Sequence, residues 1–222
     1  PGGAFAGCTG FTTVLLPESI TTLGEVTGGT EEEVLGVFEG CAGLQKIVLP
    51  ESVNSIGKNT FKDCSSVTEV VIASPKLSGL GANSFHGLAE NAIFRVQSDE
   101  VAKKLQTTSG IQEAAIVNYS AINALIEQAE GYKSSHYTAK TYATLQEALT
   151  AAKETVVKET SLQADLDAAA EKLSDAIDGL KRRSSGGGSL VVTEEEKNNN
   201  SSAEKPVIAT SSHREVGFSP GA

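Results

Sequence analysis

Residues 38–57 read FEGCAGLQKIVLPESVNSIG, and residues 61–72 read FKDCSSVTEVVI. Within Val34 to Ile72 the same pattern therefore occurs twice, with a spacing of 23 residues. The paired positions are Phe38/Phe61, Cys41/Cys64, Leu44/Val67, Ile47/Val70 and Leu49/Ile72. A fixed period of this length is typical of solenoids, because one unit cannot bury its apolar face alone and must stack on its neighbours.

The repeat continues in both directions. Upstream, residues 5–24 read FAGCTGFTTVLLPESITTLG, and the longer connection that follows places an insertion within residues 25–37. Downstream, Leu80-Gly81 and Phe85 open a fourth copy, in which Leu88 occupies the cysteine position and Phe94 and Val96 the strand positions. This copy lacks the Pro-Glu-Ser turn, as suits a terminal repeat that caps the stack.

This repeat resembles the BspA-like leucine-rich repeat, which is found mainly in bacterial surface proteins. The resemblance covers about residues 1–118 and implies a leucine-rich-repeat solenoid of about four repeats. It also implies an extracellular location, on a bacterial cell surface or secreted, and binding without catalysis. The departures are the insertion, Leu88 and the missing turn of the fourth copy.

Alternation within each copy predicts a short strand with one side turned to the core, at Val14/Leu16, Ile47/Leu49, Val70/Ile72 and Phe94/Val96. The intervening side chains are expected on the outward side of a sheet. The predicted ligand surface comprises Leu15, Lys46, Val48, Glu69, Val71 and Arg95. Two interpretations stay open: a surface for a partner, or a ladder of β-branched residues that merely favours strand.

The three cysteines, Cys8, Cys41 and Cys64, occupy one repeat position. Either they form a metal site or disulfide, or they form a buried column of small apolar side chains. Leu88 in the same column favours the second interpretation, and no fourth zinc ligand is evident nearby.

Three interpretations of the acidic insertion stay open: a binding loop, a solvated spacer or a poorly aligned repeat. The insertion lacks the alternating carboxylates of a calcium loop.

Beyond the repeats, a short helix over 99–105 with Asp99 as its cap and a strand over 114–117 are expected to cover the open end of the solenoid. From Ser120 the apolar period becomes helical. It predicts three helices, the second capped by Thr138 and the third opening at Thr160 or Ser161 with a Thr160-x-x-Gln163 capping box. Together they predict an all-α three-helix bundle.

Residues 119–183 are similar to the FIVAR module, through motifs such as Ala124-Leu125-Ile126 and Ala148-Leu149-x-x-Ala152. Modules of this kind recur in Gram-positive surface proteins and secreted carbohydrate-active enzymes, as spacers or binding units. Residues 184–222 open with a Ser/Gly linker and continue in low-complexity polar sequence, so a flexible, disordered tail is expected.

The chain of 222 residues carries 28 acidic and 18 basic side chains, a net charge of −10, which argues against a nucleic-acid partner. No apolar run is long enough to span a membrane. The chain begins at Pro1, part-way into a repeat, and is interpreted as a piece of a longer protein. No Cys–His or Ser–His–Asp set shares an element, and no phosphate loop is present, so no catalytic, cofactor-binding or metal residues are predicted.

The sequence therefore predicts a multidomain chain: a solenoid over 1–118, a helical bundle over 119–183 and a tail. The favoured function is non-catalytic adhesion, in which the sheet face binds a host or neighbouring-cell protein or glycan and the bundle is a stalk. The alternatives are accessory modules of a larger secreted enzyme that acts on polysaccharides, and a spacer without ligand. The neighbouring sequence would discriminate between them, since a catalytic domain favours the enzyme and a wall anchor favours adhesion.

Overall fold

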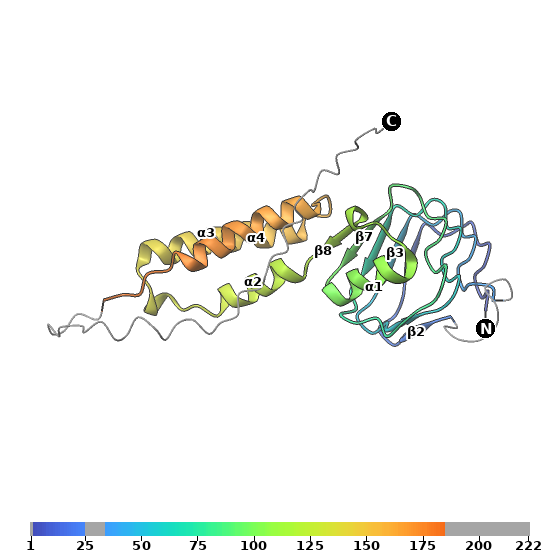
Figure 1. The fold of residues 1–222 in the computed structure, drawn as a ribbon, viewed down its shortest axis with the longest axis horizontal. Helices are drawn as coiled ribbons and strands as arrows, with labels where there is room; N and C mark the ends of the chain where they lie inside the picture. The colour runs from blue at the N-terminus through green and yellow to red at the C-terminus, as the bar shows by residue number, and fades with distance from the viewer. Residues whose placement is uncertain (1, 25–33, 185–222) are drawn as a thin grey trace, which may run out of the picture. The chain divides into compact units, whose positions relative to one another are not determined.

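Two parallel sheets run along the coils formed by the repeats (Figure 1). The computed structural model describes residues 2–24 and 34–184. The larger sheet has the order β1 (Thr13–Leu15), β3 (Lys46–Leu49), β5 (Glu69–Ile72), β7 (Ile93–Val96) and β8 (Ile116–Asn118). The smaller sheet has the order β2 (Thr22–Leu23), β4 (Ser55–Ile56) and β6 (Gly79–Leu80).

The strand register confirms the alignment of the repeats. Val14 lies opposite Ile47, Ile47 opposite Val70, and Val70 opposite Phe94. The fourth copy therefore joins the sheet in the predicted register, although it has lost both the cysteine and the Pro-Glu-Ser turn. The predicted inward side chains Ile47, Leu49, Val70 and Ile72 are fully buried.

Successive coils stack like on like. The rings of Phe5, Phe38, Phe61 and Phe85 form a parallel stack, with successive centroids 5.2, 5.3 and 5.7 Å apart. The coils also approach closely at glycines: a Cβ on Gly36 would lie 1.7 Å from the carbonyl oxygen of Asn59 on the next coil. A side chain cannot fit at that distance, so this position requires glycine.

A helix and one added strand cover the end of the stack that follows the fourth copy. Helix α1 (Asp99–Ser109) is capped by Ser98, whose hydroxyl accepts a hydrogen bond from Glu100 N. The predicted cap at Asp99 is therefore wrong by one residue, and the helix extends beyond the predicted Leu105. The predicted strand over 114–117 begins later, because Glu113–Ala115 form a 3-10 helix (η1) and β8 follows it.

Three further α-helices follow β8: α2 (Ser120–Glu130), α3 (Ala139–Val157) and α4 (Gln163–Asp178), with a 3-10 helix (η2, Ser134–His136) before α3. They pack against one another around a shared apolar core that includes Leu125, Leu145, Leu149, Leu166 and Leu173. These helices and their connections, residues 119–182, are called the helical region below. Contacts join the described residues up to Arg182 into one unit.

Helix α3 starts where the sequence predicted, after Thr138, but α4 starts later than predicted. Thr138 is the N-cap residue of α3, but its side chain makes no capping bond and instead contacts the Thr141 hydroxyl. Helix α4 begins at Gln163 rather than at Thr160 or Ser161, and the Asp165 carboxylate accepts from Leu162 N. The predicted capping box at Thr160 is therefore wrong.

Residues 25–33 of the insertion and 185–222 of the tail lie outside the described residues. The interpretations of the insertion and the expected disorder of the tail therefore stay predictions.

Candidate binding surface

The outward side of the five-stranded sheet carries two rows of side chains. One row runs through Leu15, Val48, Val71, Arg95 and Val117, which lie opposite one another in the strand register. The other runs through Thr13, Lys46, Glu69 and Ile93. The structure therefore brings all six predicted surface residues onto one side of one sheet, as the alternation pattern indicated.

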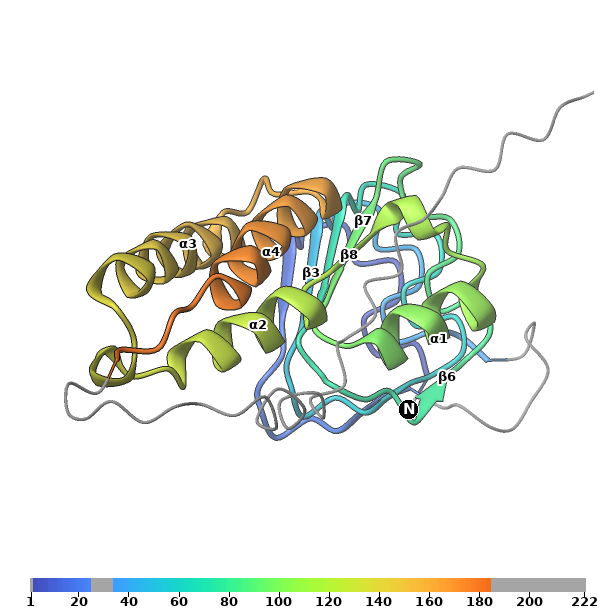
Figure 2. The same ribbon diagram turned by 60° about the vertical axis from the view of Figure 1, so that its left-hand side comes forward.

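Exposure falls along the first row from β1 to β8. Leu15 is 75% exposed, Val48 and Val71 are half-buried, Arg95 is 8% exposed and Val117 is 3% exposed. The decline follows from the helical region, which packs over the β7–β8 end of the sheet (Figure 2). Val117 belongs to the apolar core of that region, and the partly buried Ile93 packs against it. The open part of the outward face is therefore the part over β1, β3 and β5.

Arg95 corrects the expectation that all six side chains point to solvent. Its Nε donates to Glu69 Oε1 at 2.7 Å, and its Nη1 donates to Tyr119 Oη and to the carbonyl oxygen of Ser161, both at 2.8 Å. Its Nη2 donates to the carbonyl oxygen of Glu159. The guanidinium thus holds the connection between α3 and α4 against the sheet, and it is buried because this connection lies over it.

Glu69 links Arg95 to Lys46, whose Nζ lies 2.7 Å from Glu69 Oε2 and 3.6 Å from Glu159 Oε1. Burial alone would raise the pKa of Glu69, but hydrogen bonds from Lys46 and Arg95 outweigh it and hold the pKa below its usual value. The hydrogen bond to Glu69 raises the pKa of Lys46. The charges on this face are therefore paired with each other.

Three partners of this cluster were missed by sequence reasoning: Tyr119, Glu159 and Ser161. Tyr119 directly precedes α2, and the other two lie in the α3–α4 connection. The repeat register places Glu69 next to Arg95 but carries no information about a segment outside the repeats. A weak signal was available in Arg95 itself, since it is a cation within an otherwise apolar row.

The cysteines form the buried column that the sequence favoured. All three are free thiols, with Cys41 and Cys64 fully buried and Cys8 partly so. The Cys64 thiol donates to the carbonyl oxygen of Phe38 at 3.1 Å, and the Cys41 thiol donates to that of Phe5 at 3.1 Å. Burial raises the pKa of Cys64 to about 11 and also raises that of Cys41.

Within 2–24 and 34–184, no group of three or more His, Cys, Asp or Glu side chains is arranged to hold a metal ion. Over that same part of the chain, no helix combines the length and the apolar character needed to cross a bilayer. His86 is largely exposed, and its Nδ1 lies 3.8 Å from Asp63 Oδ1.

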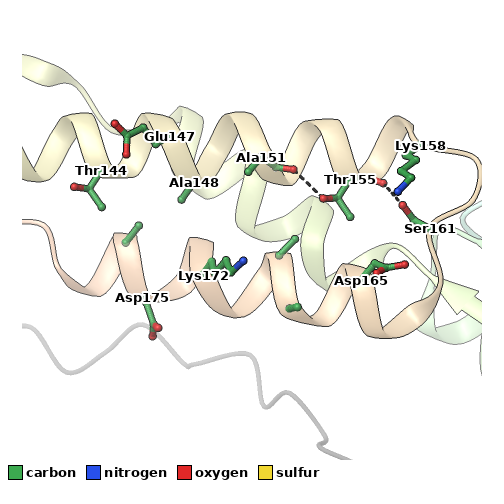
Figure 3. A pocket seen from close by; sticks show the side chains of 13 residues that line it. Thr144, Glu147, Ala148, Ala151, Thr155, Lys158, Ser161, Asp165, Lys172 and Asp175 are labelled. Carbon is green, nitrogen blue, oxygen red and sulfur yellow. Dashed lines mark hydrogen bonds between the residues drawn. The ribbon is translucent and has the colours of Figure 1, made fainter.

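A groove also lies between α3 and α4 (Figure 3). Alanine methyl groups form much of its lining, at Ala148, Ala151, Ala168, Ala169 and Ala176. Glu147, Lys158, Asp165, Lys172 and Asp175 add charges of both signs. None of its lining residues is aromatic, whereas small-molecule pockets are lined mainly by large apolar and aromatic side chains with a few convergent polar groups. The groove is therefore a weaker candidate than the sheet face.

Part of the chain matches a known protein family. Residues 1–97 match the family model described as the BspA type leucine rich repeat region, in six copies. Repeats of this family suggest a protein-interaction module at a surface. No curated protein and no solved structure gave a significant match to the chain. The coils formed by residues 1–97 are therefore similar to the BspA type leucine-rich repeats.

Proposed function

We propose that this chain is a non-catalytic interaction module of a bacterial surface or secreted protein, which binds a protein or glycan of a host or neighbouring cell. The ligand surface is the open outward face of the larger sheet. Residues 119–183 act as a FIVAR-type three-helix stalk. The similarity of the coils to this repeat family supports a binding role, and the accessible row of Leu15, Val48 and Val71 carries the choice of surface.

The backbone of this row is fixed by the sheet. Neighbouring strands lie about 4.8 Å apart, so three apolar side chains on β1, β3 and β5 form a continuous strip. Because the strands are held by backbone hydrogen bonds and a packed core, the surface is preorganised. Binding of a partner would therefore cost less free energy for ordering this surface. Leu15, the most accessible of the three, is the strongest candidate contact.

The charged residues beside the strip have a supporting role in this proposal. Lys46 and Glu69 neutralise each other at 2.7 Å, so an apolar partner does not bury an unpaired charge. Arg95 is assigned to positioning rather than to ligand contact, because the α3–α4 connection covers it. The strip with Lys46 and Glu69 at its side therefore favours a partner with an apolar segment flanked by polar groups.

The experiment introduces charge into the strip. Val48→Glu and Val71→Glu together should abolish capture of the partner from a panel of mucosal and bacterial surface glycoproteins and from a glycan array, while the melting temperature stays within about 3 °C of the parent. Leu35→Glu is the matched control, since Leu35 is a 53% exposed apolar residue outside the strands. Undiminished capture by the double variant would remove the sheet face from the proposal.

A further inference from the structure

The groove between α3 and α4 is open on the side of the helical region that faces away from α2 (Figure 3). Among the described residues, those that line it come from α3, α4 and the connection between them, and none comes from α2. Helix α2 packs on the opposite side of the pair, around core residues such as Leu149 and Leu173. The groove has a volume of about 640 Å³, and its lining extends from Thr144 to Lys158, along most of α3.

The middle of the groove is formed by small side chains. Ala151 of α3 and Ala168 of α4, called the central alanines below, are both exposed, and Ala148 and Ala169 beside them are only partly buried. Methyl groups offer little apolar surface to a small molecule, but they let the backbone of another helix come close. Packed helix axes lie about 8 to 10 Å apart, depending on the size of the side chains between them. The groove therefore fits a helical partner.

The charged side chains of the groove are available to such a partner. They are all exposed, and they comprise Glu147, Lys158, Asp165, Lys172 and Asp175. Over residues 2–24 and 34–184, none of them belongs to an ion pair of the chain itself. Their order along the groove can therefore be compared with the charges of a partner.

This order of charges is complementary to itself. On α3, Glu147 and Lys158 lie on opposite sides of the central alanines, and so do Asp165 and Lys172 on α4. In a second copy that is turned end over end onto the groove, α3 lies along α3 and α4 along α4, each pair in opposite directions. Lys172 then faces the partner's Asp165, and Lys158 faces the partner's Glu147. At about 1.5 Å of helix rise per residue, each pair matches to within about 5 Å, which a lysine side chain spans.

We propose that the groove between α3 and α4 is the docking surface for a second copy of this chain, which packs its own groove against it in the antiparallel orientation. The interface has two-fold symmetry, so each of the two ion pairs occurs twice. A second copy is favoured over other helical partners because it gives both lysines of the groove an anion to face. The proposal does not depend on what binds to the outward face of the sheet.

The test is a charge reversal in the full chain, followed by sedimentation equilibrium from about 1 to about 200 μM. Salt at about 0.15 M screens the repulsion between two acidic copies. Lys158→Glu should weaken the dimer by at least about tenfold, because two symmetric attractions become repulsions. Glu147→Lys in the same chain should restore the dimer to within about threefold of the parent, since opposite charges then face each other again. Ala151→Trp, which fills the groove, should abolish the dimer.

Lys140→Glu is the matched control. Lys140 is an exposed residue of α3 that does not line the groove, so the variant makes the same change in net charge. It should leave dimerisation unchanged, and at about 1 μM each variant should melt within about 3 °C of the parent.

A full chain that stays monomeric up to about 200 μM would overturn the proposal, whether the groove is open or is occupied by another helix. A dimer that survives Lys158→Glu and Ala151→Trp would do the same, because it would form through another surface. Failure of Glu147→Lys to restore the dimer would contradict the antiparallel orientation. In a parallel dimer α3 of one copy would lie along α4 of the other, and the double variant would bring like charges together.

Discussion

Glu69 lies between two cations on the outward face of the sheet, and its ionisation is linked to stability. Its pKa in the folded chain is below the ordinary 4.5, although burial acts in the opposite direction. A carboxyl whose pKa is lowered on folding contributes stability above its unfolded-state pKa, and this contribution is lost as the pH falls through the folded-state pKa. The relevant window therefore lies from about pH 4.5 downwards.

Replacing this carboxyl should flatten the acid dependence of stability. We expect Glu69→Gln to be less stable than the parent near neutral pH, with a gap in unfolding free energy that narrows from about pH 5 to about pH 3. Urea unfolding at a series of pH values measures the gap. Glu18→Gln is the control, since Glu18 is exposed. A gap that is constant over this range would contradict the linkage.

The cysteine column should show graded reactivity. Alkylation requires the thiolate, which is scarce near pH 8 when burial raises the pKa of Cys64 to about 11. Cys41 is fully buried and its pKa is also raised, whereas Cys8 is partly accessible. Iodoacetamide at about pH 8 should therefore label Cys8 first in the folded chain, by at least about tenfold, and all three at similar rates in urea. Peptide mass spectrometry identifies the sites, and early labelling of Cys64 would contradict the packed column.

At the scale of the elements, the phenylalanine stack should be unequally sensitive along its length. Phe61→Ala should lower the unfolding free energy by about 3 to 5 kcal/mol, because the ring is fully buried between Phe38 and Phe85. Phe5→Ala should cost about 1 kcal/mol, since one side of its ring already meets solvent. Urea unfolding compares the two variants. Equal losses would mean that the open end of the stack is as well packed as its middle.

The repeat pattern predicted the strands and their register more accurately than the capping motifs predicted the starts of the helices. Phe38, Phe61 and their equivalents recur because stacked coils bury the same position each time, so period and alternation together predict strand, face and register. The prediction for the start of α4 was wrong because Thr160-x-x-Gln163 has the spacing of a capping box, but this segment makes other contacts in the fold. Ser161 instead donates from Oγ to Thr155 O and accepts from Arg95.

The burial of Arg95 could not be predicted in the same way. Its partners Glu159 and Ser161 lie 64 and 66 residues further along the chain, in a segment with no repeat relation to the strand. Alternation gives the side of the sheet on which a residue lies, but it does not reveal what covers that side. For the candidate surface, the sequence therefore predicts the rows of side chains, and the fold determines how much of each row is open.

At the scale of the whole molecule, the coils and the helical region meet through the Arg95 cluster, through a shared apolar core and through further hydrogen bonds, such as those from Asn118 N to Gln163 Oε1 and from Asn123 Nδ2 to Gln97 Oε1. Arg95 belongs to the sheet and donates to Tyr119, Glu159 and Ser161 of the helical region. Val117 and Ile93 enter the apolar core of that region from the sheet. If these contacts couple the two parts, they should unfold together.

The unfolding of the coils and of the helical region can be followed separately in the parent chain. All four tyrosines lie between Tyr119 and Tyr142, so tyrosine fluorescence reports on the helical region. Hydrogen exchange of β5 amides, fully enclosed between β3 and β7, reports on the coils. In the parent chain, we expect one urea midpoint from both probes.

Arg95→Ala should separate these midpoints. The change leaves the carbonyl oxygens of Glu159 and Ser161 and the Tyr119 hydroxyl without their donor and removes one cation from Glu69, a loss of about 3 kcal/mol by analogy with broken buried ion pairs. The tyrosine midpoint should move to lower urea while protection of β5 changes little, because Ile72 and Val70 keep their packing. Lys153→Ala is the control, since its pair with Glu130 is half exposed and worth less than about 1 kcal/mol. Midpoints that still coincide in Arg95→Ala would show that the remaining contacts, the apolar contacts of Val117 and Ile93 and the hydrogen bond from Asn118 N to Gln163 among them, suffice to couple the two parts.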